Sequence, residues 1–273
     1  MSAASAEQLF AANRAEGRVS VDVTADGGLT RRRRVAEQGS LRVRFPGPAG
    51  GPLEAMLVNT AGGMAGGDRF AVEIAAGRDA QLVVGTAAAE KVYRSTGPAT
   101  EVAVRLALAA GARLAWLPQE TILFDGARLK RRIDVAMEEG ASLVLAEAMV
   151  LGRSAMGERV EAGAVIDRWR VRVGGRLVFA ESLRLEGAIA TMLGEPAVAD
   201  GGCAVATVLL VPGGNREVAA VRAQEFSGEV GISAWNGIAV ARLCAPDGAA
   251  LRRDLSALLA AVETAPLPKL WVD

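Results

Sequence analysis

One segment of the chain occurs three times, and this repeat is the strongest constraint on the fold. Residues 70–82, 102–114 and 131–143 align without gaps and begin 32 and then 29 residues apart. Each copy has an alternating apolar run, a Gly or Asp followed by Ala, and a second apolar run. The alternation indicates a strand with one buried face, and the Gly or Asp indicates a tight turn. Because one such unit cannot bury its apolar face alone, successive units are expected to stack.

The repeat predicts a mostly β fold of stacked or helically wound strand layers. A fourth, weaker copy spans residues 165–180 and contains the turn Gly174-Gly175. Within it Arg168, Arg170 and Arg172 share one face of a strand. That face is either solvated, as charged strand faces usually are, or a stripe that binds a partner.

The pattern changes after about residue 200. We expect a strand at 203–211, a short helix from an N-cap at Asn215 to Gln224, a hairpin around Trp235-Asn236-Gly237, and a helix over 247–262 that starts at Asp247. The chain is therefore predicted to be a single domain, 1–273. Residues 1–199 would form the repeated β-strand body, and residues 200–273 a small C-terminal α+β portion with about two helices.

The charge balance argues against nonspecific binding to nucleic acid or to a membrane surface. Lys plus Arg and Asp plus Glu both number 31, so no net charge attracts a polyanion. No apolar run is long enough to span a bilayer, and the first residues do not form a signal peptide. Cys203 and Cys244 lack C-x-x-C spacing. We expect a soluble, cytoplasmic protein with structural thiols and specific partners.

Histidine is absent from the sequence, which excludes many kinds of active site. Ser-His-Asp and Cys-His catalysis and histidine-containing metal sites all need the imidazole. No tightly bound cofactor is expected. A carboxylate-dependent hydrolase remains an alternative, but aromatic residues, which usually line sugar-binding clefts, make up only 4% of the chain. An enzyme is therefore the less favoured interpretation.

The segment 59–68 (NTAGGMAGGD) contains two glycine pairs followed by Asp68. Two of its glycines have the spacing found in phosphate-binding loops, but Asp68 stands where that motif has Lys and would repel phosphate. Glycine adopts positive φ at little cost and allows close approach of other backbone. The segment therefore predicts a structural bend at Gly62, Gly63, Gly66 and Gly67.

Four motifs follow one another along the chain: NTAGGMAGGD at 59–68, T-x-x-x-EKVYRS at 86–95, WLPQETI-x-F at 116–124 and E-x-x-x-LGR-x-AMGE at 147–158. In their order and spacing they resemble the urease accessory protein family UreD, called UreH in some bacteria. The resemblance extends from about Leu41 to Trp271, which is nearly the whole chain. Any one motif alone would be weak, but four linked motifs are specific.

This resemblance implies a non-enzymatic scaffold that binds apo-urease together with the accessory protein UreF and the GTPase UreG. It also implies a role in nickel delivery to the urease active site, with nickel bound only in transit. The fold implied is mostly β and helically wound, which agrees with the repeat. A water-filled passage through the protein is a proposed nickel route in this family.

Carboxylates suit such a passage, because they bind Ni²⁺ more loosely than imidazole or thiolate and lower the barrier for a hydrated dication. The predicted lining residues are Asp68, Glu147 and Glu181, with Thr86 as an uncharged neighbour. Structural alternatives stay open for each carboxylate. Asp68 would cap a turn. Glu147 and Glu181 would be buried partners of arginines such as Arg153 or Arg184.

Two pairs of polar residues are predicted to contact a partner protein. Gln119 and Thr121 lie beside large apolar residues that we assign to the core. Arg153 and Glu158 lie near glycines and either dock a partner or lock a turn. A β-solenoid binding module for a different partner is the remaining alternative for the whole chain.

Overall fold

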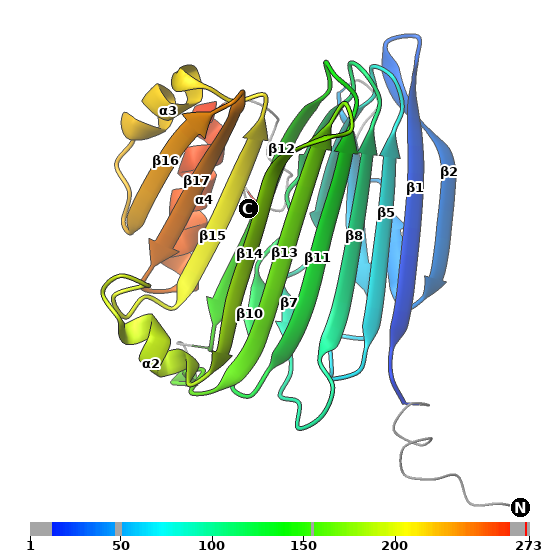
Figure 1. Ribbon diagram of the computed structural model, residues 1–273. Helices are drawn as coiled ribbons and strands as arrows, with labels where there is room; N and C mark the ends of the chain where they lie inside the picture. Colours follow the sequence, from blue (N-terminus) through cyan, green and yellow to red (C-terminus); the bar gives the residue numbers. More distant parts are fainter. Residues whose placement is uncertain (1–12, 47–50, 154–155, 263–270, 272–273) are drawn as a thin grey trace, which may run out of the picture.

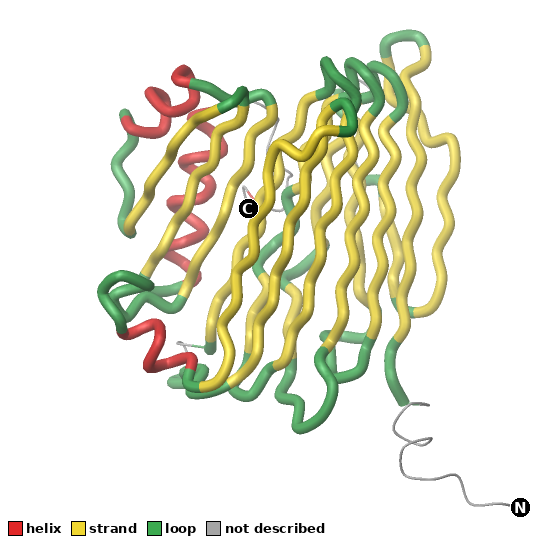
Figure 2. Tube along the Cα trace, viewed as in Figure 1, coloured by secondary structure: helices red, strands yellow, loops and turns green. Residues whose placement is uncertain are grey.

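The computed structural model describes residues 13–46, 51–153, 156–262 and 271 of the chain. The described residues form a seven-stranded sheet and a ten-stranded sheet, here named sheet A and sheet B, which face each other (Figure 1). Helices lie beside the C-terminal strands of sheet B (Figure 2). The prediction of a mostly β fold is confirmed.

The strands of sheet A are, in spatial order, β14 (Arg176–Gly187), β13 (Gly163–Val173), β11 (Arg128–Met137), β8 (Thr100–Leu108), β5 (Arg69–Ala76), β1 (Glu16–Asp26) and β2 (Leu29–Gly39). The main path of sheet B is β16 (Glu229–Trp235), β17 (Ile238–Ala245), β15 (Ala204–Val211), β12 (Ser142–Leu151), β9 (Arg113–Trp116), β6 (Gln81–Thr86), β4 (Leu53–Asn59) and β3 (Leu41–Arg44). Two short strands, β7 (Glu90–Val92) and β10 (Thr121–Leu123), pair with each other, and β10 also pairs with β12.

The chain winds from one sheet to the other, so that each repeat adds one strand to each sheet. The central strands β5, β8, β11 and β13 are parallel in sheet A, and β4, β6, β9 and β12 are parallel in sheet B. The three aligned repeats begin at neighbouring positions of sheet A, where Val102 pairs with both Phe70 and Arg131. The predicted helical winding is therefore confirmed, and the strand register matches the gapless alignment of the repeats.

The turn between the two strands of each repeat uses the residue that the sequence indicates. Asp79, Gly111 and Gly140 have φ values of 57°, 74° and 82°, in the left-handed region that glycine adopts most easily and that Asp tolerates. The fourth copy differs. Gly174 and Gly175 both have positive φ, as in a two-residue hairpin turn, so β14 returns antiparallel to β13 in sheet A instead of crossing to sheet B.

Two apolar cores hold the layers together. One lies between the two sheets, and the other lies between sheet B and the C-terminal helix α4 (Gly248–Val262). Asp247 begins α4 as predicted, since its Oδ1 accepts the N–H of Ala250 at 2.8 Å. The predicted N-cap at Asn215 is wrong: Asn215 is the first residue of α3 (Asn215–Arg222), and Gly214 is the cap.

The C-terminal portion continues sheet B. Asn236 and Gly237, with φ of 48° and 79°, form the predicted turn of the β16–β17 hairpin. Besides α3 and α4, the described residues form one unpredicted helix, α2 (Ile189–Gly194). None of the helices in the described part of the chain is long and apolar enough to cross a lipid bilayer.

Candidate functional site

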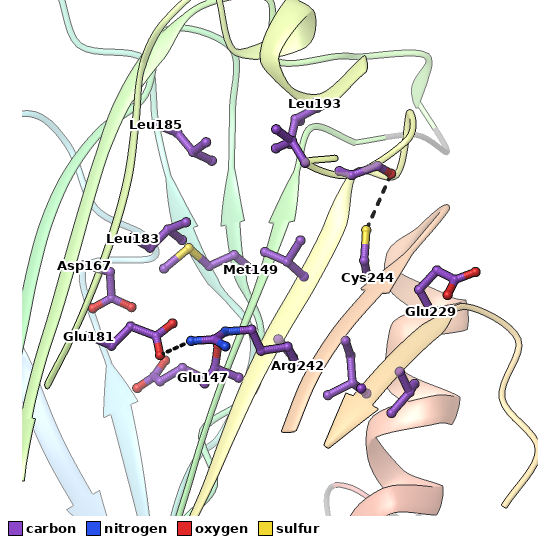
Figure 3. Close-up of a pocket in the computed structure, with 18 of the residues that line it drawn as sticks. Glu147, Met149, Asp167, Glu181, Leu183, Leu185, Leu193, Glu229, Arg242 and Cys244 are labelled. Carbon is purple, nitrogen blue, oxygen red and sulfur yellow. Dashed lines mark hydrogen bonds and ion pairs between the residues drawn. The ribbon is translucent and has the colours of Figure 1, made fainter. Parts of the chain in front are cut away.

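A cleft of about 440 Å³ opens between the two sheets at the end where β14 faces the C-terminal strands of sheet B (Figure 3). Apolar side chains such as Met149, Leu183 and Leu193 form much of its wall. Its charged side chains come from both sheets. They are the carboxylates Glu147, Asp167, Glu181 and Glu229 and the guanidiniums Arg131 and Arg242.

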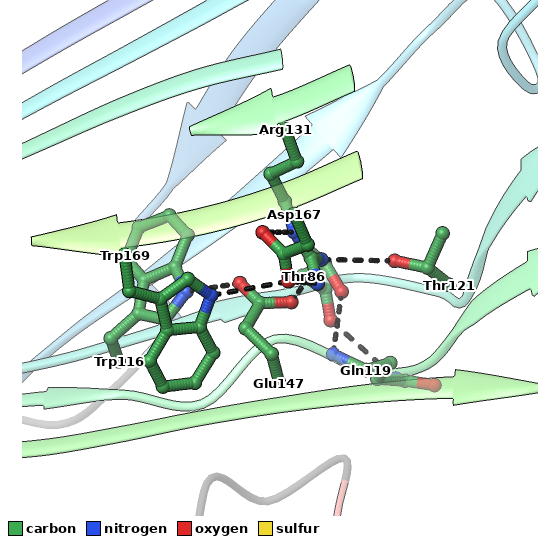
Figure 4. Close-up of polar contacts among 8 residues, drawn as sticks. All are labelled: Thr86, Trp116, Gln119, Thr121, Arg131, Glu147, Asp167 and Trp169. Atoms are coloured by element: carbon green, nitrogen blue, oxygen red, sulfur yellow. Dashed lines mark hydrogen bonds and ion pairs between the residues drawn. The ribbon is translucent and has the colours of Figure 1, made fainter. Parts of the chain in front are cut away.

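A buried network of three charged residues, here called the triad, forms the inner end of the cleft (Figure 4). Arg131 on β11 and Glu147 on β12 are each 6% exposed, and Asp167 on β13 is 4% exposed. The guanidinium of Arg131 donates to both oxygens of Asp167, from Nε at 3.1 Å and from Nη2 at 2.6 Å. Its Nη1 donates to Glu147 and, at 3.4 Å, to the hydroxyl of Thr121. The triad thereby joins sheet A to sheet B.

Two indoles complete the hydrogen bonding of the triad carboxylates. Trp116 Nε1 donates to Glu147 at 2.8 Å, and Trp169 Nε1 donates to Asp167 at 3.1 Å. Burial raises the pKa of Glu147 to about 7, against the opposing effect of Arg131. Burial alone would lower the pKa of Arg131, but the charges of Asp167 and then Glu147 outweigh it and raise that pKa. The charge of Glu147 is therefore expected to change near neutral pH.

A second ion pair joins the sheets nearer the surface. Arg242 Nη2 on β17 donates to Glu181 on β14 at 2.8 Å, with side chains 64% and 19% exposed (Figure 3). In sheet B, Thr207 pairs in register with both Glu147 and Arg242. Polar residues thus follow one line across sheet B, from the buried triad to the exposed pair.

The predicted passage residues do not all lie together. Glu147 and Glu181 line the cleft, but their arginine partners are Arg131 and Arg242 instead of the suggested Arg153 or Arg184. Asp68 and Thr86 are not among the residues that line it. Asp68 accepts hydrogen bonds from the N–H groups of Ala65 and Ala15 at 2.7 and 2.9 Å. These bonds agree with the structural alternative, in which Asp68 caps a turn. Thr86 accepts the N–H of Gln119 at 2.9 Å.

The glycine bend has two different causes. Gly62, Gly63 and Gly67 have φ of 77°, 149° and 92°, as expected. Gly66 has no positive φ among the described glycines; it is required because a Cβ there would lie 2.0 Å from Ser95 Oγ. A Cβ at Gly63 would also lie 2.5 Å from the ring of Tyr93. The bend therefore packs against the second family motif.

The four motifs that carry the family resemblance meet in one region of paired strands, here called the motif edge. Met64, Val92, Leu123 and Leu151 are bridged in register, one from each motif. Beside them, Tyr93 contacts Phe124 edge-on with centroids 5.1 Å apart, and Arg153 lies 4.1 Å over the same Phe124 ring. Of the large apolar residues near Gln119 and Thr121 that were assigned to the core, Trp116 and Leu117 are buried, whereas Phe124 is half-buried.

The predicted partner-binding residues differ in accessibility. Arg153 and Glu158 are joined by backbone hydrogen bonds in both directions and by a 2.6 Å side-chain pair, which forms the locked turn, and Arg153 remains exposed. Thr121 is buried at 7% exposure. Gln119 is half-buried, and its Oε1 accepts from Arg252 of α4 at 3.2 Å. Of these four residues, Arg153 is exposed, Gln119 and Glu158 are half-buried, and Thr121 is buried.

The sequence interpretation did not identify Arg131, Asp167 or Arg242 as site residues. A signal for Arg131 was present, because it occupies the apolar position that Phe70 and Val102 hold in the other repeats. Among the described residues, no group of three or more His, Cys, Asp or Glu side chains is arranged to hold a metal ion. The site is thus a charged cleft with a buried ion-pair network.

Sequence comparisons agree with the motifs. The family model described as "UreD urease accessory protein" matches residues 15–272. A protein of Rhodopseudomonas palustris (strain BisA53) is 58% identical over 267 residues, covering 97% of this chain and 93% of the relative. One from Bradyrhizobium diazoefficiens is 57% identical, with 97% and 96% covered. Both are named "Urease accessory protein UreD", the name of an accessory factor, which sets the hydrolase alternative aside. The chain therefore belongs to the UreD family of urease accessory proteins, which act as accessory factors and not as enzymes.

Proposed function

We propose that this chain acts in the cytoplasm with UreF and the GTPase UreG on apo-urease, and that it assists the delivery of nickel to the urease active site. We assign the passage of the metal ion to the cleft between the sheets. The observation that carries this assignment is the charge of the lining, where four carboxylates face two guanidiniums. Fully ionised, the cleft has two extra negative charges, which match one dication.

The chemistry of the lining favours passage over capture. Carboxylate oxygens hold Ni²⁺ less tightly than imidazole or thiolate, and the chain has no histidine. Cys244 lines the cleft, but burial raises its pKa and keeps the thiol protonated. Glu147, Asp167 and Glu181 are each paired with an arginine, so at these three carboxylates the ion would compete with a guanidinium instead of entering an empty site.

The proposal keeps Glu147 and Glu181 and leaves out Asp68 and Thr86, since only the first two line the cleft. The test is coexpression of the double variant Glu147→Gln and Glu181→Gln with urease and the other accessory proteins. Pull-down yield and nickel per urease site are measured from the same cells. Glu186→Gln is the matched control, because Glu186 is on the same strand β14, pairs with Arg184 and lies outside the cleft.

We expect normal assembly and reduced nickel incorporation in the double variant, and normal values for both in the control. Normal nickel loading in the assembled double variant would remove the cleft from the mechanism. Loss of assembly together with nickel would assign the carboxylates to stability of the fold. A wild-type chain that never copurifies with urease subunits would favour a binding module for another partner.

For partner contact we propose the exposed part of the motif edge, with Arg153 and Glu158 as contacting residues. The edge-to-face pair of Tyr93 and Phe124, with Arg153 over the Phe124 ring, gives this edge the aromatic and arginine composition common in protein interfaces. Arg153→Glu should reduce pull-down of accessory proteins without changing the unfolding midpoint. Arg176→Glu, an exposed residue of β14, is the charge-matched control, and an equal loss in both variants would contradict the assignment.

A further inference from the structure

The outer face of sheet A is bare in the part of the chain that the structure describes. Its central strands β1, β5, β8, β11 and β13 are parallel. The C-terminal helix α4 packs against sheet B, away from this face (Figure 1). Parallel sheets are usually covered on both faces, so an uncovered face of five parallel strands is a candidate for a partner.

A hollow of about 940 Å³ crosses this face near the beginnings of the strands. The strand register places five lining residues in one row, one from each parallel strand: Arg18, Ala71, Ala103, Arg132 and Arg168. The two alanines are in the middle of the row and the arginines are at its ends. The whole hollow is here called the basic groove, and along this row small side chains form a floor between long cationic ones.

The groove is basic although the whole chain has no net charge. Five exposed basic side chains line it, namely Arg18, Arg69, Lys130, Arg132 and Arg168, against the two acidic residues Glu16 and Glu101. Arg69 reaches Glu101 only at 3.7 Å, with both side chains more than half exposed. Among described residues, Arg18, Lys130 and Arg168 have no ion-pair or hydrogen-bond partner. Three cationic groups in one hollow are therefore available to an anionic ligand.

We propose that the basic groove binds an extended acidic segment of a partner protein. The row crosses four strand spacings of about 4.8 Å, or roughly 19 Å, which is the length of about six extended residues. Carboxylates at the ends of such a segment would meet Arg18 on one side and Arg168 on the other, whereas Arg132 is already paired with Asp134. Charge complementarity of this kind gives specificity and fast association.

The same features disfavour nucleic acid as the ligand. Glu16 and Glu101 lie within the groove and would repel a continuous phosphate backbone, whereas a polypeptide can place a neutral or basic residue opposite them. Phe70 is the aromatic residue of the described lining, and it is 4% exposed. It therefore offers no stacking surface for bases, which single-stranded nucleic acids usually require.

The test uses the purified full chain and a fluorescein-labelled peptide of about eight residues with Glu at alternate positions, since alternate side chains of an extended segment share one face. Fluorescence anisotropy at about 150 mM NaCl limits long-range attraction. A peptide with Gln in place of Glu and an oligothymidine are the alternative probes. The variants are Ala103→Glu, the double change Arg18→Gln and Arg168→Gln, and the control Ala107→Glu. Ala107 is on the same strand and face but outside the basic groove.

We expect roughly tenfold weaker peptide binding for Ala103→Glu and for the arginine double variant, and a change within about twofold for the control. The Gln peptide should bind at least about tenfold more weakly than the Glu peptide. No binding by the wild-type chain, equal losses in Ala103→Glu and Ala107→Glu, or tighter binding of oligothymidine would overturn the proposal. It rests on this sheet face alone, so its failure would leave the cleft proposal unaffected.

Discussion

Replacing Glu147 with Gln should stabilise this protein at about pH 8 and change its stability much less at about pH 5. The triad has two carboxylates for one guanidinium, and Arg131 already holds Asp167 through two hydrogen bonds. Ionised Glu147 is therefore the extra buried charge. Its pKa rises from 4.5 to about 7, chiefly through burial, and a shift of that size corresponds to about 3 kcal/mol.

The sign follows from proton binding. Between pH 4.5 and about 7 the folded state holds more protons on Glu147 than the unfolded state. The wild-type free energy of unfolding should therefore fall as pH rises through this window. Above about pH 7, Glu147 should contribute no further change with pH. The Gln variant, which resembles the protonated acid, should lose that part of the slope. Urea denaturation at steps from about pH 5 to pH 8.5 measures both curves.

Asp167→Asn is the matched control. It removes a carboxylate from the two-bond pair with Arg131 and should cost about 3 to 5 kcal/mol at both ends of the pH range, since a buried guanidinium loses its main partner. If the Glu147 variant is less stable than the wild type at about pH 8, Arg131 holds Glu147 ionised with a net gain. That result would refute the assignment of Glu147 as the extra charge.

Three further outcomes are expected. Gly63→Ala should destabilise the protein by more than about 2 kcal/mol, because φ is 149° and a Cβ would lie 2.5 Å from the Tyr93 ring. Gly62→Ala should cost about 1 kcal/mol, because the space around Gly62 is open. Equal costs for the two variants in urea denaturation would contradict the packing argument. Asp68→Ala should cost about 2 to 4 kcal/mol, since two N–H groups lose their acceptor, and an unchanged midpoint would show that water replaces the carboxylate. Cys244 should react with iodoacetamide more slowly than free cysteine at about pH 7.5, because burial raises its pKa; a faster reaction would contradict this.

The winding of the chain could be predicted because each repeat carries its own turn residue. Asp79, Gly111 and Gly140 mark the place where the chain leaves sheet A, and a gapless alignment fixes which residues are neighbours in the sheet. The end of the winding could not be predicted in the same way. Gly174-Gly175 also marks a turn, but two consecutive glycines with positive φ make a hairpin, and the alternation of the flanking strands is the same in both cases.

The candidate site was only half predicted, because its ion pairs join residues far apart in sequence. Glu147 stands out as an acid in an apolar run, and Glu181 shares a face with apolar neighbours. Their partners are 16 and 61 residues away, and nothing local identifies an arginine 61 residues away as the partner of Glu181. Arg242 lies on the inner face of sheet B, but the alternation of β17 alone does not show which face is the inner one. That follows only from the pairing of β17 with β15.

The position of the triad follows from where the two sheets stop covering each other. Along one row of sheet A the inward residues are Phe70, Val102, Arg131 and Asp167, so the row changes from apolar to charged toward β13. Phe70 faces the closed core, whereas Arg131 and Asp167 line the cleft. The triad side chains are only 4% to 6% exposed, so their ion pairs and the two indole hydrogen bonds offset the cost of burying them. Asp68, Glu120 and Asp254 are also buried, but Arg131, Glu147 and Asp167 are the buried charged residues that line the cleft, where β14 and the C-terminal strands of sheet B face each other.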